Sequence, residues 1–475
     1  MNNRRIQEKI RTGLQGPTHL SAKVTISRLI AFDAFVEVME HNRKPDEILE
    51  ELYVKNTKDL KRVDRNLTKE LVFGGLRWHK KIYWILQQTS KKRDLKKVSP
   101  QVRSALVLGT YQIFYMDRIP DRAAVNESVE YVRSKGEASA VPFVNGVLRQ
   151  IARRAEYFTK PDKKAKPVDY LALQFSHPDW LVRRWHDRFN FERMETMLAA
   201  NNQPPPIFIR VNQDKTTPQA LQDNLLRDEQ VQSEKGSLKG CLILKKHPDL
   251  GKEGLFGQGF YTIQDQASQL IPYLVEIKEG LTIVDAAAGP GGKITHMCEL
   301  GKGKVRIIGV EKNDLQMERA RETARRLGHD DKIEWVLQDF MEFTPSAPVD
   351  KVLLDAPCTG LGVIRRHPEG KWQKSEAGIK EVADQQRLMI AHSLKMLKPG
   401  GELIYSVCSF ELDETEAQAK WIKQTYGNKI ELITPVSRLP DYFKRYVTRD
   451  NILMIYAGNQ DDMDGFGAFI IKWKG

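Results

Sequence analysis

Apolar residues in the first third of the chain follow helical spacing. They recur every three or four residues, as at Leu29, Phe32, Val36 and Met39. The stretch at 105–116, ALVLGTYQIFYM, is apolar on nearly every side, which is typical of a helix buried at the centre of a bundle. No segment between 27 and 155 has a convincing strand pattern. These observations predict an all-α domain over residues 1–159.

The pattern changes after a charged stretch, KPDKKAKP, at residues 160–167. Its charge and its flanking prolines predict a linker. The residues that follow mix two periods, because DWLVRRWHDRF has helical spacing whereas PPPIFIRVNQ alternates like a strand. We therefore predict a linker and a small α+β segment over residues 160–255.

Residues 256–475 contain five short apolar runs separated by segments of helix length. The runs are LTIVDA, VRIIGVE, IEWVLQD, KVLLDAP and GELIYSV. Strands that alternate with helices predict a largely parallel, Rossmann-like α/β sheet, whose ligands bind at the carboxyl ends of the strands. Polar residues that end or follow the five runs are Asp285, Glu311, Asp339, Asp355 and Cys408.

The formal net charge of +13 comes from one part of the chain. Residues 1–166 hold 34 Lys and Arg against 19 Asp and Glu, a net charge of +15, and the remaining residues carry −2. This basic excess favours a polyanionic partner, most simply a nucleic acid. Solvated helix faces are the alternative explanation.

The cysteine content argues against structural cross-links. Four cysteines in 475 residues make no disulfide framework, and none of them pair as CxxC. We therefore expect no metal site, and we expect any thiol chemistry to be catalytic. No apolar run approaches the about 20 residues of a membrane span, and the basic N-terminus lacks an apolar signal core. A cytoplasmic protein without a membrane partner is expected.

The glycine-rich turn AAAGPGGK, residues 286–293, is a candidate ligand loop. It is not a P-loop, because Ala287 and Ile294 occupy the places of the required glycine and hydroxyl residue, and it is not GxGxxG. Glu311, at the end of the next run, is placed to accept hydrogen bonds from ribose hydroxyls. A ring of carboxylates favours a cationic sulfonium over a pyrophosphate. The turn alone could also be glycine-rich for packing reasons.

Several segments resemble one enzyme family. DAAAGPGGKITHM, DAPCTGLGVIRRHPEGKW and YSVCSFELDETE closely resemble the cofactor loop, fourth motif and sixth motif of the S-adenosylmethionine-dependent RNA cytosine-5 methyltransferases, and GFYTIQDQASQL resembles the element before that loop. RIPDRAAVNESVEYVR and FVNGVLRQIAR resemble a NusB-like RNA-binding domain. The resemblance covers nearly the whole chain and implies a class I methyltransferase domain over 256–475. The pairing of these domains is typical of bacterial enzymes that act on 16S ribosomal RNA, which is the implied partner.

The resemblance also implies the roles of individual residues. Cys408 would be the nucleophile, Cys358 would assist product release, and Asp355 would lie by the methionyl amino group and the target base. Glu311 would hold the ribose of S-adenosyl-L-methionine and Asp339 would lie beside its adenine. The turn around the methionine part of this cofactor would consist of Ala287, Ala288, Gly289, Pro290, Gly291, Gly292 and Lys293. Asp355, like Asp285, could instead be a helix cap.

The chain departs from the family pattern at three positions. Gly289 stands where alanine is usual, Glu311 where aspartate is commoner, and Gly467 where a second aromatic residue is frequent. The first two differences should leave cofactor binding intact. The third puts in doubt any contact from that aromatic residue.

Chemistry at carbon 5 of cytosine explains a pair of thiols. Addition of a thiolate to carbon 6 makes carbon 5 nucleophilic, and a second acid–base group helps to remove the proton and expel the thiolate. Position alone does not say which thiol attacks. DNA cytosine-5 methyltransferases use the Pro-Cys thiol, which favours Cys358, whereas the RNA family favours Cys408, and we predict Cys408.

The attacking thiol needs a cation or hydrogen-bond donors nearby to be substantially ionised, because a free thiol has a pKa of about 8.5. Lys293, Arg365 and Arg366 are the candidates. The two adjacent arginines also suit contacts with RNA phosphates or bases, so we predict that they bind RNA. Cys241 and Cys298 are expected to be inert buried thiols.

Other classes of protein compete with this interpretation. An amino-group methyltransferase would carry (N/D)PP(Y/F) where this chain has DAPC. A non-catalytic assembly factor could use the helical domain alone, but it would need neither the two thiols nor the cofactor loop. A cytosine-5 methyltransferase that acts on transfer RNA is the closest rival. We expect a monomer.

We predict that RNA binding depends on residues 1–166, which hold the whole positive excess. Removing them should lower affinity for the substrate RNA sharply. With the full chain, log affinity should fall with log salt at a slope of about −0.7 per single-strand phosphate contacted. Equal affinity and an equal salt slope for residues 168–475 alone would contradict the prediction.

Overall fold

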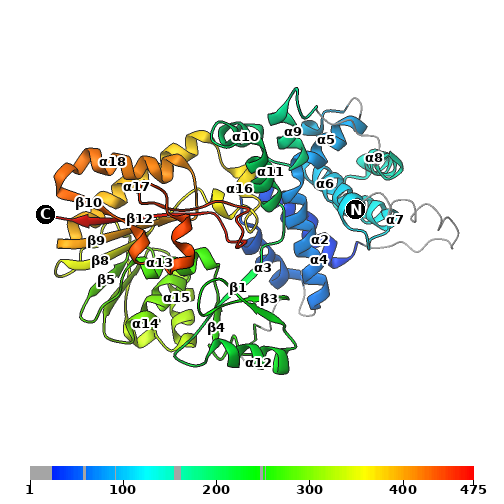
Figure 1. Ribbon diagram of the computed structural model, residues 1–475. Coiled ribbons are helices and arrows are strands. Elements are labelled where there is room, and N and C mark those ends of the chain that lie inside the picture. The colour runs from blue at the N-terminus through cyan, green and yellow to red at the C-terminus, as the bar shows by residue number, and fades with distance from the viewer. Residues whose placement is uncertain (1–23, 57–59, 91–92, 155–161, 247–249, 252) are drawn as a thin grey trace. The chain divides into compact units, whose positions relative to one another are not determined.

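The N-terminal third of the chain forms a bundle of helices (Figure 1). The computed structural model describes residues 24–56, 60–90, 93–154, 162–246, 250–251 and 253–475, and it divides the chain into two units, Met1–Thr159 and Lys160–Gly475. Helices of the first unit are α2 (Ile26–His41), α3 (Pro45–Asn56), α4 (Arg62–Arg77), α5 (His79–Ser90), α6 (Pro100–Tyr115), α7 (Asp121–Ser134) and α8 (Val141–Arg154). The described residues of this unit contain no strand, so the predicted all-α class is confirmed.

Helix α6 is the centre of this bundle, as its sequence predicts. It contacts α2, α4, α5, α7 and α8, and every residue from Ser104 to Gln112 is buried. Pro100 begins the helix, and the Ser99 hydroxyl accepts a hydrogen bond from the Val102 N–H at 3.2 Å. Gly109 lets α7 and α8 approach closely, because a Cβ there would lie 2.7 Å from the Ser128 hydroxyl and 2.8 Å from a Leu148 methyl.

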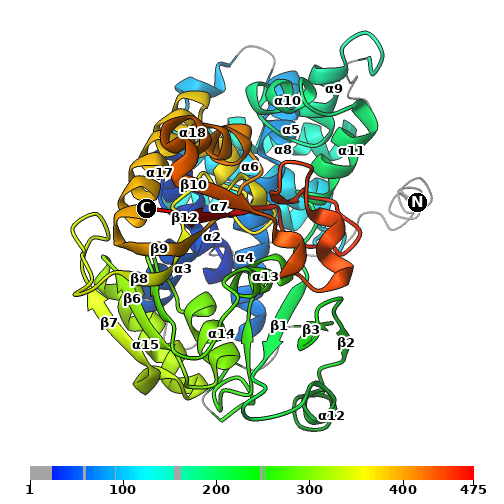
Figure 2. The same cartoon turned by 60° about the vertical axis from the view of Figure 1, so that its left-hand side comes forward.

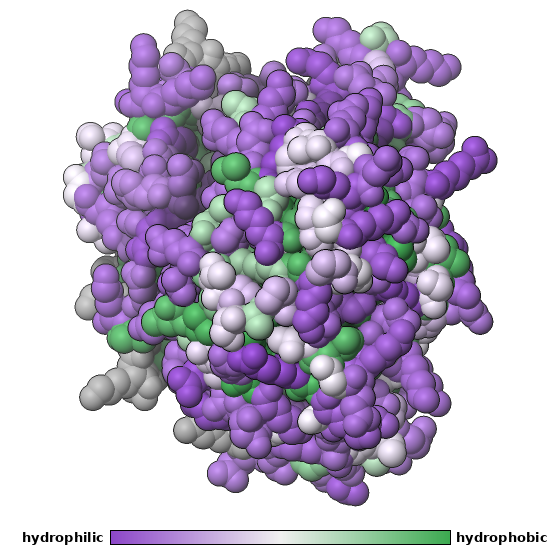
Figure 3. All heavy atoms as spheres, turned by 90° about the vertical axis from the view of Figure 1, so that its left-hand side faces the viewer, coloured by the Kyte–Doolittle hydropathy of each residue, from purple (hydrophilic) through white to green (hydrophobic). Residues whose placement is uncertain are grey.

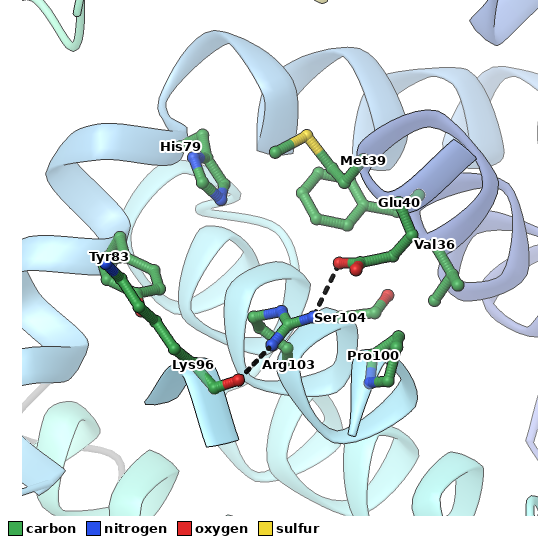
Figure 4. Close-up of a pocket in the computed structure, with 10 residues that line it drawn as sticks. Val36, Met39, Glu40, His79, Tyr83, Lys96, Pro100, Arg103 and Ser104 are labelled. Atoms are coloured by element: carbon green, nitrogen blue, oxygen red, sulfur yellow. Dashed lines mark hydrogen bonds and ion pairs between the residues drawn. The ribbon is translucent and has the colours of Figure 1, made fainter. Parts of the chain in front are cut away.

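A cavity of about 210 Å³ opens between α2, α5 and the start of α6 (Figure 4). It is lined by Phe35, Val36, Met39, Glu40, His79, Tyr83, Lys96, Pro100, Arg103 and Ser104. The Arg103 guanidinium donates to Glu40 at 2.7 Å and to the carbonyls of Leu95 and Val98 at 3.3 and 3.1 Å. The charge of Arg103 is therefore used to hold the turn before α6 against α2.

The second unit begins with three short helices and a small sheet (Figure 2). Its helices are α9 (Pro167–Gln174), α10 (Asp179–His186) and α11 (Phe191–Ala200). Strands β1 (Ile207–Val211), β2 (Ser233–Lys235), β3 (Cys241–Leu244) and β4 (Tyr261–Ile263) pair in the antiparallel order β2-β3-β1-β4, with α12 (Pro218–Glu229) beside them. The predicted helix and strand of this region are both present. The predicted linker ends inside α9, because Pro167 takes the first turn of that helix; Lys160 and Pro161 lie outside the described residues.

The five predicted apolar runs form the parallel centre of a large sheet. They are β5 (Thr282–Asp285), β6 (Arg306–Glu311), β7 (Ile333–Leu337), β8 (Val349–Asp355) and β9 (Leu397–Val407). The strand order is β10-β12-β9-β8-β5-β6-β7, with β11 (Leu453–Ile455) paired to β12. Strand β12 (Phe466–Trp473) runs antiparallel to β9 and to β10 (Ile430–Ile433). The predicted α/β sheet is confirmed.

Helices cover both faces of this sheet (Figure 1). Helices α17 (Glu376–Met396) and α18 (Glu416–Tyr426) lie on one side. Helices α13 (Gln266–Leu274), α14 (Gly292–Gly301) and α15 (Asp314–Leu327) lie on the other, and the short helix α16 (Gly370–Gln373) follows β8. The face drawn in Figure 3 is mostly hydrophilic, with apolar side chains in small groups. Among the described helices, none is long and apolar enough to cross a membrane.

The close packing at Gly109 generates a stability prediction with a matched control. Gly109→Ala should lower the thermal midpoint of the helical unit, since overpacking a core costs about 1–3 kcal/mol. Gly146→Ala in α8 should raise it, because no described atom lies within 4 Å of a Cβ there and alanine gains about 0.5–1 kcal/mol in a helix. Calorimetry of both variants checks this, and shifts of the same sign would contradict it.

Candidate active site

The predicted site residues lie along one edge of the large sheet. Strands β5 to β9 pair with one another in parallel, so their carboxyl ends meet at that edge. Asp285 pairs with Leu353 in the β5/β8 register, and Asp355 pairs with Ser406 in the β8/β9 register. The turns that follow β8 and β9 consequently begin side by side.

These two turns bring Cys358 and Cys408 together. Their Sγ atoms are 3.1 Å apart, and both side chains are half-buried. The backbone fixes the pair, because the Ala356 N–H donates to the Ser406 carbonyl at 2.9 Å and the Gly362 N–H donates to the Cys408 carbonyl at 3.1 Å. A hydrogen bond to Cys408, burial, and the negative charges nearby raise the pKa of Cys358 well above that of an ordinary thiol.

A lysine–aspartate ion pair lies beside the thiols. Lys293, in the first turn of α14, contacts Asp355 at 2.5 Å, and the Ser406 hydroxyl donates to the other Asp355 oxygen at 2.7 Å. Burial opposes the charge of Lys293, but Asp355 and then Cys408 and Asp285 outweigh burial and raise its pKa. Among the three cations that the sequence offers to the thiols, Lys293 interacts electrostatically with Cys408.

The glycine-rich turn is shaped by backbone that only glycine adopts freely. Gly289 and Gly291 have φ values of 50° and 89°, and a Cβ on Gly291 would lie 3.0 Å from the Ala320 carbonyl oxygen. Glu311 accepts from the Gly289 N–H at 3.1 Å and from the Asn313 N–H at 2.9 Å. The turn and the end of β6 are therefore held as one element.

Asp285 is a buried carboxylate with unused hydrogen-bonding capacity. It is 1 % exposed, and neither of its oxygens has a well-formed hydrogen bond within the described residues. Burial and then the charge of Asp355 raise its pKa to about 7, and the Ala287 N–H offsets only a small part of this shift. Gly291 is the N-cap of α14, and Gly360 is the N-cap of the short 3-10 helix that follows β8 (Leu361–Val363), so neither aspartate is a helix cap.

Asp339 lies further out on the same edge. Its side chain is 42 % exposed, 3.7 Å from the Lys312 ammonium, and it accepts from the Met341 N–H at 2.9 Å. Its exposure leaves carboxylate surface for a ligand at the end of β7.

Arg365 and Arg366 do not face the thiols. Arg365 is 4 % exposed and donates to Asp464 and Asp462 at 2.6 Å each, and Arg366 donates to Asp464 and, at 2.9 Å, to Asp265. This ion-pair cluster joins the turn before α13, the loop after Cys358 and the loop before β12. The RNA contact predicted for Arg365 is corrected to a structural role, because burial leaves its guanidinium no surface for a phosphate. The contact predicted for Arg366, whose side chain is 26 % exposed, stays a prediction.

Sequence reasoning missed two residues that support the site. Arg210 on β1 donates to the Gly292 carbonyl at 2.7 Å and pairs with Glu299 at 2.9 Å, so the small sheet holds the start of α14. Glu414 is fully buried beside the thiols and accepts from Thr359 and Ser409. The run SFELDETE offers several acidic residues, and nothing in their spacing shows which one is buried.

Packing explains the glycine that replaces an aromatic residue near the C-terminus. A Cβ on Gly467 would lie 2.4 Å from the Thr415 methyl and 3.1 Å from the Ser409 carbonyl oxygen. An aromatic side chain cannot fit there without moving the Cys408 turn. The neighbouring Phe466 is buried instead, with its ring centroid 5.5 Å from the Lys293 ammonium. Cys241 and Cys298 are also buried, and burial raises the pKa of each to about 12, as expected for inert thiols.

Three family models match successive parts of the chain. The NusB family matches residues 25–153, the RsmF/B-like ferredoxin-like domain matches 177–250, and the 16S rRNA methyltransferase RsmB/F model matches 272–472. The helical unit is therefore a NusB domain, and the small α+β segment is a ferredoxin-like domain.

Relatives match over most of the chain. A probable ribosomal RNA small subunit methyltransferase B of Bacillus subtilis (strain 168) is 32% identical, over 95% of this chain and 100% of the relative. Ribosomal RNA small subunit methyltransferase B of Sodalis glossinidius is 32% identical over 82% of this chain and 87% of the relative. The crystal structure of PH0851 has the same fold, with a TM-score of 0.77 at 22% identity over 96% and 100% of the two chains. A methyltransferase homolog from Pyrococcus horikoshii gives a TM-score of 0.51 at 25% identity, over 64% of this chain and 97% of that one. The chain belongs to the RsmB/F family of ribosomal RNA methyltransferases and is an enzyme.

Proposed function

We propose that this enzyme transfers a methyl group from S-adenosyl-L-methionine to carbon 5 of a cytosine in 16S ribosomal RNA, through a covalent bond to Cys408. The observation that carries the proposal is the pair of thiols 3.1 Å apart beside the Lys293–Asp355 ion pair. The choice of 16S ribosomal RNA rests on the relatives, whose names specify the ribosomal small subunit.

The residues at the strand ends fit the proposed cofactor. Asp285 offers two buried carboxylate oxygens without partners in the described part of the chain, at the start of the glycine-rich turn. Such oxygens suit the donors of a cationic amino acid. Glu311 and Asp339 offer acceptors at the ends of the next two strands, where the ribose and the adenine would lie. S-adenosyl-L-methionine would supply an electrophilic methyl group at this edge of the sheet.

The roles of Cys408 and Cys358 in the reaction depend on which of the two thiols carries a proton. The Cys408 thiolate adds to carbon 6 of the cytosine, and the electron pair moves to carbon 5, which takes the methyl group. The carbon 5 proton then leaves to a base, and its electron pair re-forms the double bond between carbons 5 and 6. The bond between carbon 6 and the Cys408 sulfur breaks at the same time, which returns Cys408 to the thiolate. Cys358 retains its proton during the attack, since its pKa is raised, and its Sγ atom lies 3.1 Å from the Cys408 sulfur that is expelled in the release step. Asp355 holds Lys293 beside the pair.

The target cytosine must also unstack from its neighbouring bases to expose carbon 6. This costs a few kcal/mol in a duplex and less in a loop or a single strand. A single-stranded or loop cytosine is therefore the proposed target.

The roles of the two thiols predict opposite behaviour of their alanine variants. Cys408→Ala should be inactive and form no covalent complex with RNA. Cys358→Ala permits attack and methyl transfer but slows release, so a protein–RNA band that survives denaturation should accumulate with substrate RNA and S-adenosyl-L-methionine. Denaturing gel electrophoresis makes the comparison, and the reverse pattern would exchange the two roles.

The cofactor site generates a binding prediction. Glu311→Ala should weaken S-adenosyl-L-methionine binding by about 1.5–3 kcal/mol, the range for hydrogen bonds to a charged group. Turnover at saturating cofactor should change less. Glu334→Ala, at an exposed side chain on β7 paired with Arg306, is the control and should leave affinity unchanged. Calorimetric affinities that are equal in both variants would remove Glu311 from the site.

Bisulfite sequencing of RNA tests the product itself. Incubation with 16S ribosomal RNA should protect a cytosine from deamination, and transfer RNA should show no protected position. Protection of a cytosine in transfer RNA alone would instead make the protein a transfer RNA methyltransferase.

A further inference from the structure

Each cysteine of the site is followed by a hydroxyl residue, and the two hydroxyls share one acceptor. Thr359 follows Cys358 and Ser409 follows Cys408. Both side chains donate to the same oxygen of Glu414, each at 2.5 Å. One carboxylate thus joins the turn after β8 to the turn after β9.

Two further donors complete the surroundings of Glu414. Its other oxygen accepts from the Thr359 N–H at 2.9 Å and from the Gln386 side-chain amide on α17 at 3.1 Å. Glu414 is 0 % exposed, and no Lys or Arg of the described residues forms an ion pair with it. Four converging donors match the acceptor capacity of an ionised carboxylate, so hydrogen bonds offset the cost of burying this group.

The charged groups around the thiols are unequally distributed. Lys293 on α14 couples electrostatically to Cys408, whereas Glu414 and Asp355 act on Cys358. Asp285 on β5 interacts with Lys293, and the Tyr405 hydroxyl on β9 donates to Gln386 and to the Glu414 carbonyl. Glu414 accepts two hydrogen bonds from Thr359, next to Cys358, and one from Ser409, next to Cys408. A negative charge held against the Cys358 turn opposes loss of the Cys358 proton.

We propose that Glu414 is a positioning residue that fixes the two cysteine turns together and keeps the proton of the pair on Cys358, which leaves Cys408 as the thiolate. The inference deepens the proposed function and rests on it for the chemical roles of the thiols. The proton arrangement is a property of the protein alone and needs neither RNA nor cofactor. Glu414 touches no reacting atom, and it acts through Thr359 and Ser409.

The first test uses the wild-type full chain. Iodoacetamide reacts with thiolates, so peptide mass spectrometry of labelling from about pH 6 to about pH 10, around the ordinary thiol pKa of about 8.5, resolves the order of ionisation. Cys408 should be labelled at lower pH than Cys358. Cys241 and Cys298 serve as internal references and should react last, because burial raises the pKa of each to about 12.

The second test removes the charge of Glu414 and keeps its shape. In Glu414→Gln the ratio of Cys408 to Cys358 labelling should fall about tenfold, which corresponds to one pKa unit. Glu411→Gln is the matched control, because Glu411 is also buried but accepts from Arg184 and Trp185, at 2.6 Å each. That ratio should stay at the wild-type value in the control, while thermal unfolding verifies that both variants are folded.

A third variant decides the question if Glu414→Gln does not fold. Thr359→Val removes the side-chain hydrogen bond to Glu414 but keeps the Glu414 charge and the bond from the backbone N–H of residue 359. The pH profiles of Cys408 and Cys358 labelling should therefore approach each other, by less than in Glu414→Gln. Thr359→Ser retains the hydroxyl and should restore the wild-type order. Three results would overturn the proposal. The first is labelling of Cys358 at lower pH than Cys408 in the wild type. The others are an equal change of the labelling ratio in Glu411→Gln and Glu414→Gln, and a labelling ratio that changes in neither Glu414→Gln nor Thr359→Val.

The outcome is independent of the proposed reaction. Labelling without RNA reports only the proton position, whereas bisulfite protection reports the product. A failure of one measurement therefore leaves the other standing.

Discussion

The parallel pairing of β8 with β9 is the constraint on which the site depends. It sets Asp355 opposite Ser406, so the turns that carry Cys358 and Cys408 begin next to each other at the end of the sheet. A shift by one residue would turn every side chain of one strand to the other face. The bonds from Ala356 to Ser406 and from Gly362 to Cys408 carry the register beyond the last paired residues and into the two turns.

The second constraint on the site is the cost of burying charged side chains. Asp285, Lys293, Asp355 and Glu414 all lie within a small region of low exposure, where an unpaired charge is costly. Asp355 forms an ion pair with Lys293, and Glu414 accepts four hydrogen bonds. Asp285 has neither an ion pair nor a well-formed hydrogen bond within the described residues, and the charge of Lys293 and the Ala287 N–H offset only part of the rise in its pKa. The carboxylate with the fewest partners is therefore the one at the start of the glycine-rich turn.

The ferredoxin-like domain does more than connect the two ends of the chain. Arg210 reaches from β1 into α14, where it contacts Gly292 and Glu299, and Arg366 reaches Asp265 in the turn that follows β4. These contacts join the small sheet to the glycine-rich turn and to the loop after Cys358.

Local patterns in the sequence determined the elements and the places where chemistry would sit. The helical spacing near Leu29 and the apolar runs that end at Asp285 and Asp355 depend on neighbours a few residues away, so they are readable without a structure. The motifs around Cys358 and Cys408 are also local, so the sequence identified both thiols as candidate catalytic groups.

The tertiary structure alone decided which charges pair. Arg365 was predicted to face RNA, but it binds Asp464, 99 residues further along the chain. Likewise, Glu414 could not be distinguished from Glu411 and Asp413 by spacing. The physical reason is that the free energy of a charged side chain depends on its partners and its burial, and loop packing between distant segments sets both.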